Sequence, residues 1–480
     1  MQVNETLNDG LKRKLSVTIP SSHLNEKLDA KLQQLKSQAN LKGFRPGKVP
    51  MTHLKKTYGR SAMSEVMQEE INSTVQETLS GREERAAMQP KIDLPEDQST
   101  INKVLDGEAD LAFEVSYEVL PPVKLMDFKK IKVTRPVVET TDEEVDAELQ
   151  RVFRNNRKYE DKGDGGVVAE GDRLGLTFEG KINGKPFEGG KSDHAHLIVG
   201  SGEFIPGFEE QLVGMKKDEN RQIKVTFPKD YGNEELAGKE ATFDVKVLHI
   251  DGPDDSKLDD EFAKKLGVDD VAALRTAVKD QMELTLRNMS QQNVKRQVLD
   301  AMDEGHKFDI PSELVDAEFN SIWHQVQHEI EQHGKTFEDE GTTEEEARAQ
   351  YRTISERRVR LGLVVAEIGN KNKIEVTEEE HQQALLAEVR RFPGQEQQVY
   401  DYYIKNKQAL AGLRAPVYEN KVVTFVIELA DVTDKKMDRK ALAELISDDN
   451  DEGPISSSHS HDHDHDHEGH DHEGHDHHDH

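Results

Sequence analysis

The chain has 480 residues, of which 34% are hydrophobic and 33% charged, and its formal net charge is −31. This length is too great for one ordinary hydrophobic core, so two to four domains are expected. Cysteine is absent, which excludes a disulfide framework, thiolate catalysis and Cys-based zinc sites. The sequence shows no signal peptide and no apolar run long enough to cross a membrane, so a reducing, cytoplasmic location is expected.

The charge is unevenly distributed. Residues 1–60 hold 12 Lys and Arg against 4 Asp and Glu, whereas the rest of the chain is strongly acidic. A basic N-terminal segment (residues 1–60, called the head below) on an otherwise acidic chain indicates an anionic partner for the head alone. Nucleic acid and membrane headgroups both fit this charge, but the head lacks the amphipathic basic helix with Trp or Phe anchors that a membrane adaptor would use.

The N-terminal part predicts a small α+β module. Residues 11–19 alternate like a half-buried strand, and leucines then recur at helical spacing after Ser22, a predicted N-cap. A second helix is expected over 51–79 with a break at Gly59, and residues 111–119 alternate again. The pattern predicts strand, two helices and strand.

A turn rich in Gly, Pro and basic residues, LKGFRPGKVP (41–50), separates the two predicted helices. Its glycines permit backbone angles closed to other residues, and Pro46 stiffens the loop between them. Such a loop presents Phe44 and Arg45 outward, where Arg suits phosphate and Phe suits stacking or a pocket. On residue types alone, an ordinary surface loop is the competing interpretation.

The stretch GFRPGKVP, placed between two helices near the N-terminus, resembles the ribosome-binding signature of bacterial trigger factors, G-F-R-x-G-K-x-P. The matching positions are Gly43, Phe44, Arg45, Pro46, Gly47, Lys48 and Pro50. The resemblance implies that this loop docks beside the nascent-chain exit of the large ribosomal subunit, against a ribosomal protein and rRNA. It assigns the contact to Phe44, Arg45 and Lys48.

The middle of the chain predicts a connector and then a β domain. A helix is expected to begin with a capping box at Thr141, and a Gly-rich segment at 161–172 marks a boundary. Short strands follow over 173–250, with one short helix at PGFEEQLVGM. Within this region GSGEFIPG (200–207) lacks the spacing and the following Lys of a phosphate-binding loop, so it predicts a turn.

Three segments of this domain resemble FKBP-type peptidyl-prolyl isomerases: LTFEGKINGKPFEGG, VGSGEFIPGFEEQLVGMKKDE and FPKDYG. The resemblance places the catalytic, pocket-lining positions at Phe178, Phe187, Glu188, Phe204, Ile205, Phe208, Tyr231 and Phe243. Free-standing members of that family usually have Trp at the pocket floor, where this chain has Phe208. On residue types alone these aromatics also fit the core of a small β domain, and Phe178 and Phe243 suit both roles.

An aromatic pocket of this kind suits rotation about X–Pro bonds. The barrier is about 18–20 kcal/mol because the amide has partial double-bond character. The twisted state loses that resonance, so an apolar pocket that binds it lowers the barrier without a nucleophile or a metal. The Tyr231 hydroxyl and the Ile205 backbone N–H are the expected donors to a substrate carbonyl. No cofactor is expected to be required.

Residues 258–445 predict helices with narrow apolar stripes, apart from a strand-like segment at 421–429. TEEE (377–380) is a further capping box. The pair His324 and His328 lacks the HExxH pattern and predicts a solvated helix face, with adventitious metal binding as the alternative. In trigger factors this region is the chaperone body, which implies a core with Leu361, Leu363, Val364 and Val365 and an exposed client surface with Phe392, Val399, Tyr402, Tyr403 and Ile404.

The last segment, residues 447–480, is low in complexity and holds eleven His but no Lys or Arg. Such a composition predicts disorder. Alternating His and Asp can chelate Ni, Zn, Cu or Co with little selectivity, so adventitious metal binding is expected at His461, His463, His465, His467, His470 and His472. The competing interpretation is a solubilising polyanion, and the family resemblance says nothing about the tail.

The chain is thus identified as a member of the bacterial trigger factor family, an α+β multidomain protein. The expected parts are an N-terminal α+β ribosome-binding module (1–118), a connector and helix (119–155), an inserted FKBP-like β domain with one short helix (156–251), an elongated all-helical C-terminal body (252–446) and a disordered His-rich tail (447–480).

The resemblance implies a cytoplasmic chaperone that holds nascent chains at the ribosomal exit tunnel and isomerises X–Pro bonds. Its expected partners are the large ribosomal subunit and unfolded nascent polypeptides, without DNA or membrane, and a homodimer off the ribosome is left open. The alternative is a His-tailed FKBP-like metallochaperone and isomerase that acts off the ribosome.

Overall fold

The computed structural model describes residues 1–38, 49–82, 84–95, 97–229, 231, 236–333, 336–337 and 342–447, apart from the side chains of Glu188, His333 and Ser447. The chain divides into two units, one of Met1–Arg135, Gln292–Asp434 and Glu444–His480, the other of Pro136–Gln291 and Lys435–Ala443. The predicted ribosome-binding loop at 43–48 and the predicted metal-binding His residues lie outside the described residues.

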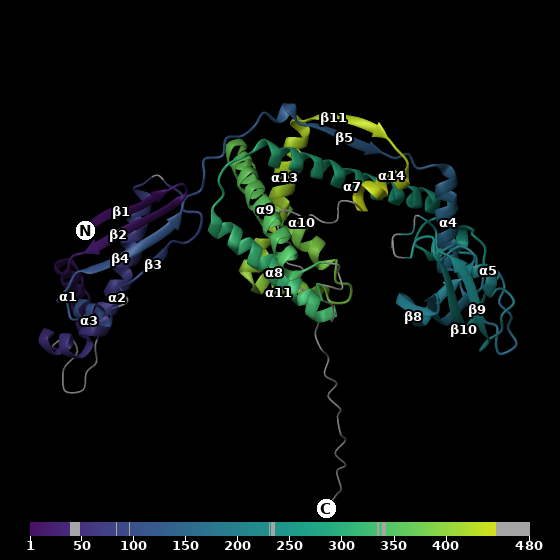
Figure 1. Cartoon of the computed structure of the whole chain (residues 1–480), viewed down its shortest axis with the longest axis horizontal. Helices are drawn as coiled ribbons and strands as arrows, with labels where there is room; N and C mark the ends of the chain where they lie inside the picture. Colours follow the sequence, from purple (N-terminus) through teal and green to yellow (C-terminus); the bar gives the residue numbers. More distant parts are fainter. Residues whose placement is uncertain are drawn as a thin grey trace, which may run out of the picture. The chain divides into compact units, whose positions relative to one another are not determined.

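The N-terminal module is an antiparallel sheet with helices against it (Figure 1, purple and dark blue). The strands lie in the order β1-β2-β4-β3. The elements are β1 (Gln2–Asp9), β2 (Lys12–Ile19), α1 (Ser21–Gln38), α2 (Met51–Ser80), β3 (Lys91–Asp93), α3 (Gln98–Leu105) and β4 (Leu111–Glu118). Strand β1 is exposed along its whole length, so its sequence carries no alternation of polar and apolar residues that would predict it.

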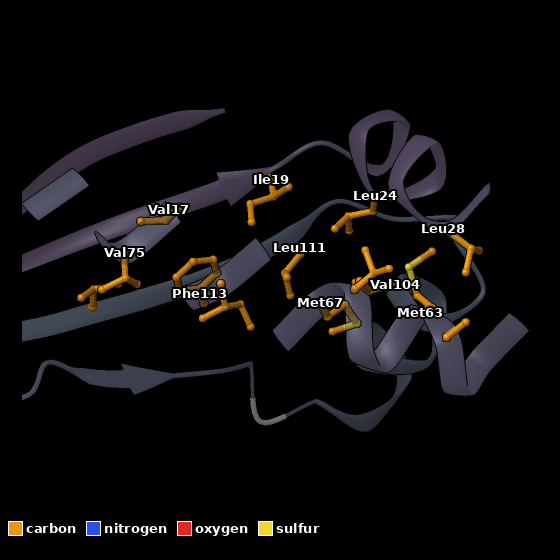
Figure 2. Packing of buried hydrophobic residues seen from close by; sticks show 14 of the residues in the cluster. Val17, Ile19, Leu24, Leu28, Met63, Met67, Val75, Val104, Leu111 and Phe113 are labelled. Carbon is orange, nitrogen blue, oxygen red and sulfur yellow. The ribbon is translucent and has the colours of Figure 1, made fainter. Parts of the chain in front are cut away.

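The core of this module lies between the sheet and the helices, as Figure 2 shows. Alternate residues of β2 and β4 point into it, and apolar residues of α1, α2 and α3 meet them there. The labelled members are Val17, Ile19, Leu24, Leu28, Met63, Met67, Val75, Val104, Leu111 and Phe113. The alternation that predicts the two strands is therefore the pattern that fills this core.

Two details of the helix prediction were wrong. Helix α2 runs unbroken through Gly59, which is buried, so packing outweighs the cost of about 1 kcal/mol that a helical Gly carries. Helix α1 begins at Ser21, one residue before the predicted N-cap Ser22. The Ser21 backbone N–H donates to Asp110 Oδ1 at 2.7 Å, a long-range partner that the local sequence does not reveal.

The helical body shares a core with the connector. Its elements are η1 (Phe128–Lys130), β5 (Lys132–Val137), α7 (Val271–Gly305), α8 (Ser312–His333), α9 (Glu344–Asn372), α10 (Glu378–Val389), α11 (Glu396–Lys405), α12 (Lys407–Gly412), α13 (Arg414–Leu429), β11 (Asp431–Lys436) and α14 (Arg439–Ser447). Strand β5 pairs with β11. Leu361, Val364 and Val365 are buried in this core as predicted, and Leu363 is half-buried.

The strand predicted at 421–429 was wrong, because these residues belong to helix α13. The β-branched run VVTFVI favours a strand locally. Val422, Val423 and Val426 are nevertheless all buried in one core with residues of α7 and α9. Their spacing places them on one face of a helix, so tertiary packing overrides the local preference.

The second unit holds the inserted β domain (Figure 1, teal). Its sheet has the order β6-β10-β7-β8, with β9 paired to β10. The elements are α4 (Asp142–Asn156), β6 (Tyr159–Asp161), β7 (Arg173–Ile182), β8 (Lys185–Ile198), α5 (Phe208–Leu212), β9 (Asn220–Thr226), β10 (Glu240–Pro253) and α6 (Asp260–Lys265). The predicted short helix is α5, whose Phe208 and Leu212 enter the core of the sheet.

The chain enters and leaves this β domain through helices that pack together. Helix α4 precedes the sheet and α6 follows it, and Phe153 of α4 meets Phe262 of α6 with ring centroids 4.9 Å apart. Both predicted capping boxes, at Thr141 and at Thr377, are confirmed. A third, at Thr343, begins α9.

Candidate functional site

An aromatic pocket opens in the β domain, with a cavity volume of about 520 Å³. Strands β7, β8 and β10, helix α5 and the loops around them supply its walls. Most of the walls are hydrocarbon or aromatic ring. The lining residues are Phe178, Phe187, Gly189, Gly190, Glu203, Phe204, Ile205, Pro206, Phe208, Phe227, Pro228, Tyr231, Leu236 and Phe243.

Phe208 lies at the centre of the ring cluster. It is the first residue of α5 and is 1% exposed. Its ring stacks on Phe204 with centroids 5.0 Å apart and meets Phe243 edge-on at 5.4 Å. Phe178 of β7 completes the cluster at 6.2 Å from Phe208. These contacts fix the floor of the pocket, because edge-to-face and offset rings attract one another beyond their burial.

A second group of rings forms the opposite wall. Phe187 of β8 meets Phe243 at 5.9 Å and Phe227 at 5.8 Å, both edge-on. The absence of a side chain at Gly180 makes room for this wall. A Cβ there would lie 2.6 Å from the Phe243 ring and 2.8 Å from the Phe187 ring.

The rim carries the polar groups. Tyr231 is 39% exposed and its ring packs edge-on against Phe227 at 4.7 Å. Within the described part of the chain, neither the Tyr231 hydroxyl nor the Ile205 backbone N–H has a hydrogen-bond partner. Both are therefore able to donate to a bound carbonyl. Among the described lining residues there is no Ser, Thr, Cys, Lys or His to act as a nucleophile, and no group of three or more metal-ligating side chains.

The structure brings seven of the eight predicted pocket residues together: Phe178, Phe187, Phe204, Ile205, Phe208, Tyr231 and Phe243. Glu188 follows Phe187 in β8, and its side chain lies outside the described atoms. Sequence reasoning missed Phe227, Pro228 and Leu236. The first two stand in FPKDYG, the same segment that contains Tyr231, so the signal was present.

Ion pairs tie the strands together. The Lys181 ammonium lies 2.6 Å from a Glu179 carboxylate oxygen and 2.9 Å from Asp244 Oδ2. These hydrogen bonds raise the pKa of Lys181 to about 12. The contact with Asp244 links β7 to β10, the two strands that carry Phe178 and Phe243.

Other predicted sites gain little from the structure. His324 and His328 are exposed on α8, as expected of a solvated face. Over the described residues, no three His, Cys, Asp or Glu side chains are grouped so as to hold a metal ion. None of the helices in those same ranges is long and apolar enough to cross a membrane.

Sequence models of known families match three parts of the chain. Residues 1–152 match "Bacterial trigger factor protein (TF)" and residues 270–428 match the C-terminus of the same protein. Residues 165–248, which hold the aromatic pocket, match "FKBP-type peptidyl-prolyl cis-trans isomerase".

Curated relatives agree with these matches over nearly the whole length. A trigger factor from Brucella abortus (strain S19) is 49% identical over 442 residues, which cover 92% of this chain and 93% of the relative. The chain belongs to the trigger factor family. A trigger factor from Parvibaculum lavamentivorans is also 49% identical, over 92% of this chain and 86% of its own, and one from Chelativorans sp. is 47% identical.

Among solved structures, one titled for promiscuous substrate recognition in the folding and assembly activities of the trigger factor chaperone is similar to this chain. It has 18% sequence identity and a TM-score of 0.45, and the match covers 89% of this chain and 99% of that one.

As a trigger factor, the protein is a ribosome-associated chaperone with an FKBP-type peptidyl-prolyl isomerase domain. It binds the ribosome and nascent chains. Members of the trigger factor and FKBP families need no cofactor for isomerisation. None of the comparisons favours the alternative of a His-tailed metallochaperone.

Proposed function

We propose that the aromatic pocket is the site where X–Pro bonds are isomerised, with Phe178, Phe187, Glu188, Phe204, Ile205, Phe208, Tyr231 and Phe243 as its working residues. The observation that carries the proposal is the cluster of phenylalanines around Phe208, which forms an apolar cavity in the segment matched by the isomerase family. The proline ring would lie against Phe208, and the flanking carbonyls would face the rim.

Catalysis in this pocket requires that the twisted amide bind more tightly than the planar amide. The planar amide of the ground state is stabilised by resonance, and water stabilises its polarised carbonyl. The twisted amide has less charge separation, so an apolar wall that excludes water favours it over the planar form. A hydrogen bond from Tyr231 or from the Ile205 N–H then orients the substrate without forming a covalent bond.

The test is to truncate Tyr231 and compare it with a tyrosine of equal exposure elsewhere. Tyr231→Ala should lower kcat/KM for an X–Pro peptide about 5- to 10-fold, the value of one hydrogen bond and one ring contact. Tyr58→Ala on α2, where the tyrosine is 39% exposed like Tyr231, should leave the rate unchanged.

Phe208→Ala is a second test, but it also costs about 3–5 kcal/mol of stability in a buried core. It should slow isomerisation while suppression of aggregation survives, because we assign holding to residues 252–446. Equal loss of both activities would show instead that the pocket is itself the client site.

We further propose that unfolded clients bind the exposed side of the helical body. Tyr402 and Ile404 of α11 are 37% and 49% exposed, and Tyr400 and Leu386 lie exposed in the same region of the sequence. Phe392, Val399 and Tyr403 are half-buried. Exposed apolar groups among charged residues suit weak and promiscuous binding of unfolded segments.

We also propose that the loop with Gly43, Phe44, Arg45, Pro46, Gly47 and Lys48 docks on a ribosomal protein and rRNA at the exit tunnel. The match of residues 1–152 to the family supports this assignment. Membership of the trigger factor family supports the proposed cytoplasmic location. The tail is proposed to bind divalent metal adventitiously. The domain boundaries at 118, 155, 251 and 446 are proposed on the sequence. The separate cores of the N-terminal module and of the β domain support those at 118, 155 and 251.

A further inference from the structure

One buried carboxylate organises the loop that leads into the aromatic pocket. Glu209, the second residue of α5, is 7% exposed. Its Oε2 accepts hydrogen bonds from the backbone N–H of Gly200 at 2.8 Å and of Gly202 at 3.1 Å. Its Oε1 accepts from the backbone N–H of Phe204 at 3.1 Å and from the Ser201 hydroxyl at 3.3 Å. Four donors of one short loop thus converge on a single side chain.

The backbone of this loop has the form of an anion site. Gly200 and Gly202 adopt φ values of 86° and 75°, in the left-handed region that glycine enters freely. Alternation of such residues with ordinary ones turns successive N–H groups toward one point, the arrangement that holds phosphates in other proteins. Here the chain supplies the anion itself. The Gly-rich segment 200–207 lacks the spacing of a phosphate-binding loop, and its anion-binding position is filled by the Glu209 carboxylate of the same chain.

The same carboxylate connects the floor of the pocket with its rim. Glu209 follows Phe208, the ring at the centre of the floor. The loop that it holds ends at Phe204, and Ile205 and Pro206 come next in the rim. The 5.0 Å stack of Phe204 on Phe208 therefore lies directly beside the hydrogen bond from the Phe204 N–H.

Physical chemistry indicates that this arrangement is held firmly. A buried carboxylate is unfavourable unless hydrogen bonds replace its water, and here four donors do so. Its removal would leave three backbone N–H groups without their partner, and the loop would move to find water. A displacement of about 1 Å in groups that position a substrate can cost a factor of about 100 in rate.

We propose that Glu209 is a positioning residue for prolyl isomerisation. Its carboxylate fixes the loop from Gly200 to Phe204 and thereby sets the Phe204 ring and the Ile205 N–H against the substrate. Glu209 does not touch the substrate and acts only through the loop. The inference rests on the proposed assignment of the aromatic pocket as the isomerase site.

The experiment compares Glu209 with its neighbour Glu210, which lies on the same short helix and is exposed. In the full chain, Glu209→Ala should lower kcat/KM for an X–Pro peptide about 10- to 100-fold. Glu209→Gln should give an intermediate loss, because one acceptor oxygen remains while the amide NH₂ meets the loop donors. Glu210→Ala removes the same charge and should change the rate by less than about twofold.

Two further readouts separate positioning from general damage. Hydrogen exchange at the amides of Gly200, Gly202 and Phe204 should accelerate in the Glu209 variants and not in Glu210→Ala. Formate or acetate should restore part of the rate and of the amide protection to Glu209→Ala, because the small carboxylate occupies the vacated site. Chloride at the same ionic strength should not.

An unchanged kcat/KM in Glu209→Ala overturns the proposal, and so does unchanged exchange at the three amides. If Glu209→Ala does not fold, Glu209→Gln keeps the volume of the side chain and carries the same comparison. Failure of the underlying site assignment looks different. In that case Tyr231→Ala would isomerise peptides at the wild-type rate, whatever the Glu209 variants do.

Discussion

Close approach of a side chain to the backbone distinguishes two glycines on the same helix. A Cβ added at Gly369 of α9 would lie 1.7 Å from the Tyr418 hydroxyl oxygen and 2.5 Å from Cζ of the same ring. A Cβ added at Gly362, seven positions earlier, would meet no atom within 4 Å. The two positions look alike in sequence, and only the packing of α13 on α9 separates them.

We therefore expect opposite effects from the same substitution. Gly362→Ala should raise the free energy of unfolding by about 0.5–1 kcal/mol, because Ala loses less entropy in a helix. Gly369→Ala should lower it by about 1–3 kcal/mol, because the Tyr418 ring must move. Urea unfolding followed by Trp323 fluorescence measures both, since the Arg348 guanidinium of α9 lies 4.3 Å from the centroid of that ring. Two changes of the same sign would refute the packing argument.

At the scale of elements, helices α1 and α2 are joined through one acidic side chain. Glu70 of α2 is 7% exposed and pairs with two residues of α1. His23 Nε2 lies 2.7 Å from one carboxylate oxygen, and Lys27 Nζ lies 2.8 Å from the other. Burial raises the pKa of Glu70, but the hydrogen bonds from Lys27 and His23 outweigh it, so the pKa is lowered below its ordinary value.

This lowered pKa predicts a stability that depends on pH. The contribution of Glu70 is fully present above the unfolded pKa of about 4.3 and is lost as the pH falls through the lower folded pKa. Glu70→Gln resembles the protonated form of Glu70. Near neutral pH the variant should therefore have a lower free energy of unfolding than the wild type. This deficit should shrink as the pH falls from about 5 to about 3.

Urea titration with hydrogen exchange of α1 peptides as the probe measures that deficit. The matched control is Glu69→Gln, the neighbouring residue, whose side chain is 67% exposed and pairs with Lys31. It should cost less than about 1 kcal/mol at any pH. A Glu70→Gln deficit that stays constant down to pH 3 would contradict the expected loss of this ion pair in acid.

For the whole molecule, the uneven charge separates the function of the head from that of the body. The basic residues of the N-terminal 60 positions precede and follow, in the sequence, the segment that contains Phe44, Arg45 and Lys48. Cations that bind phosphate release counterions, so such binding weakens steeply as salt rises. An acidic remainder of the chain would be repelled by the same phosphates, so the charge distribution favours the proposed docking through residues 1–60.

The variant with Phe44→Ala, Arg45→Ala and Lys48→Ala should therefore lose co-sedimentation with large ribosomal subunits. The control variant, Lys55→Ala with Lys56→Ala, also removes two cations, but from α2, and should keep most of the binding. Isomerase activity should be unchanged in both, because the pocket lies in another domain. Unaltered binding by the triple variant would refute the docking assignment.

The tail gives a further prediction at this scale. Metal binding needs neutral imidazole, so affinity should fall steeply below the free His pKa of about 6.5. Titration calorimetry of Ni or Zn into the full chain, against a chain that ends at Ile446, measures the contribution of the tail. Thermal unfolding of the body should not shift when metal is added. Equal stoichiometry in the two chains would assign the metal to His324 and His328 instead.

Much of this fold can be predicted from the sequence because it depends on interactions between residues that are close in the chain. The capping boxes at Thr141 and Thr377 act over three residues, so a few consecutive residues of the sequence predict where each of these two helices begins. The alternation in β2 and β4 is likewise local, because each strand buries one face. The aromatic positions of the pocket were read through motifs of the FKBP family, which fix both residue type and spacing.

Contacts between distant residues decided the rest. The run at 421–429 became a helix because its valines meet α7 and α9, and no window around it contains those helices. Strand β1 exists because β2 offers it hydrogen bonds, although its own side chains are all exposed. The role of Glu209 is visible only once the loop from Gly200 folds back onto α5. A sequence states which groups are present, whereas burial and partners depend on which distant segments pack together.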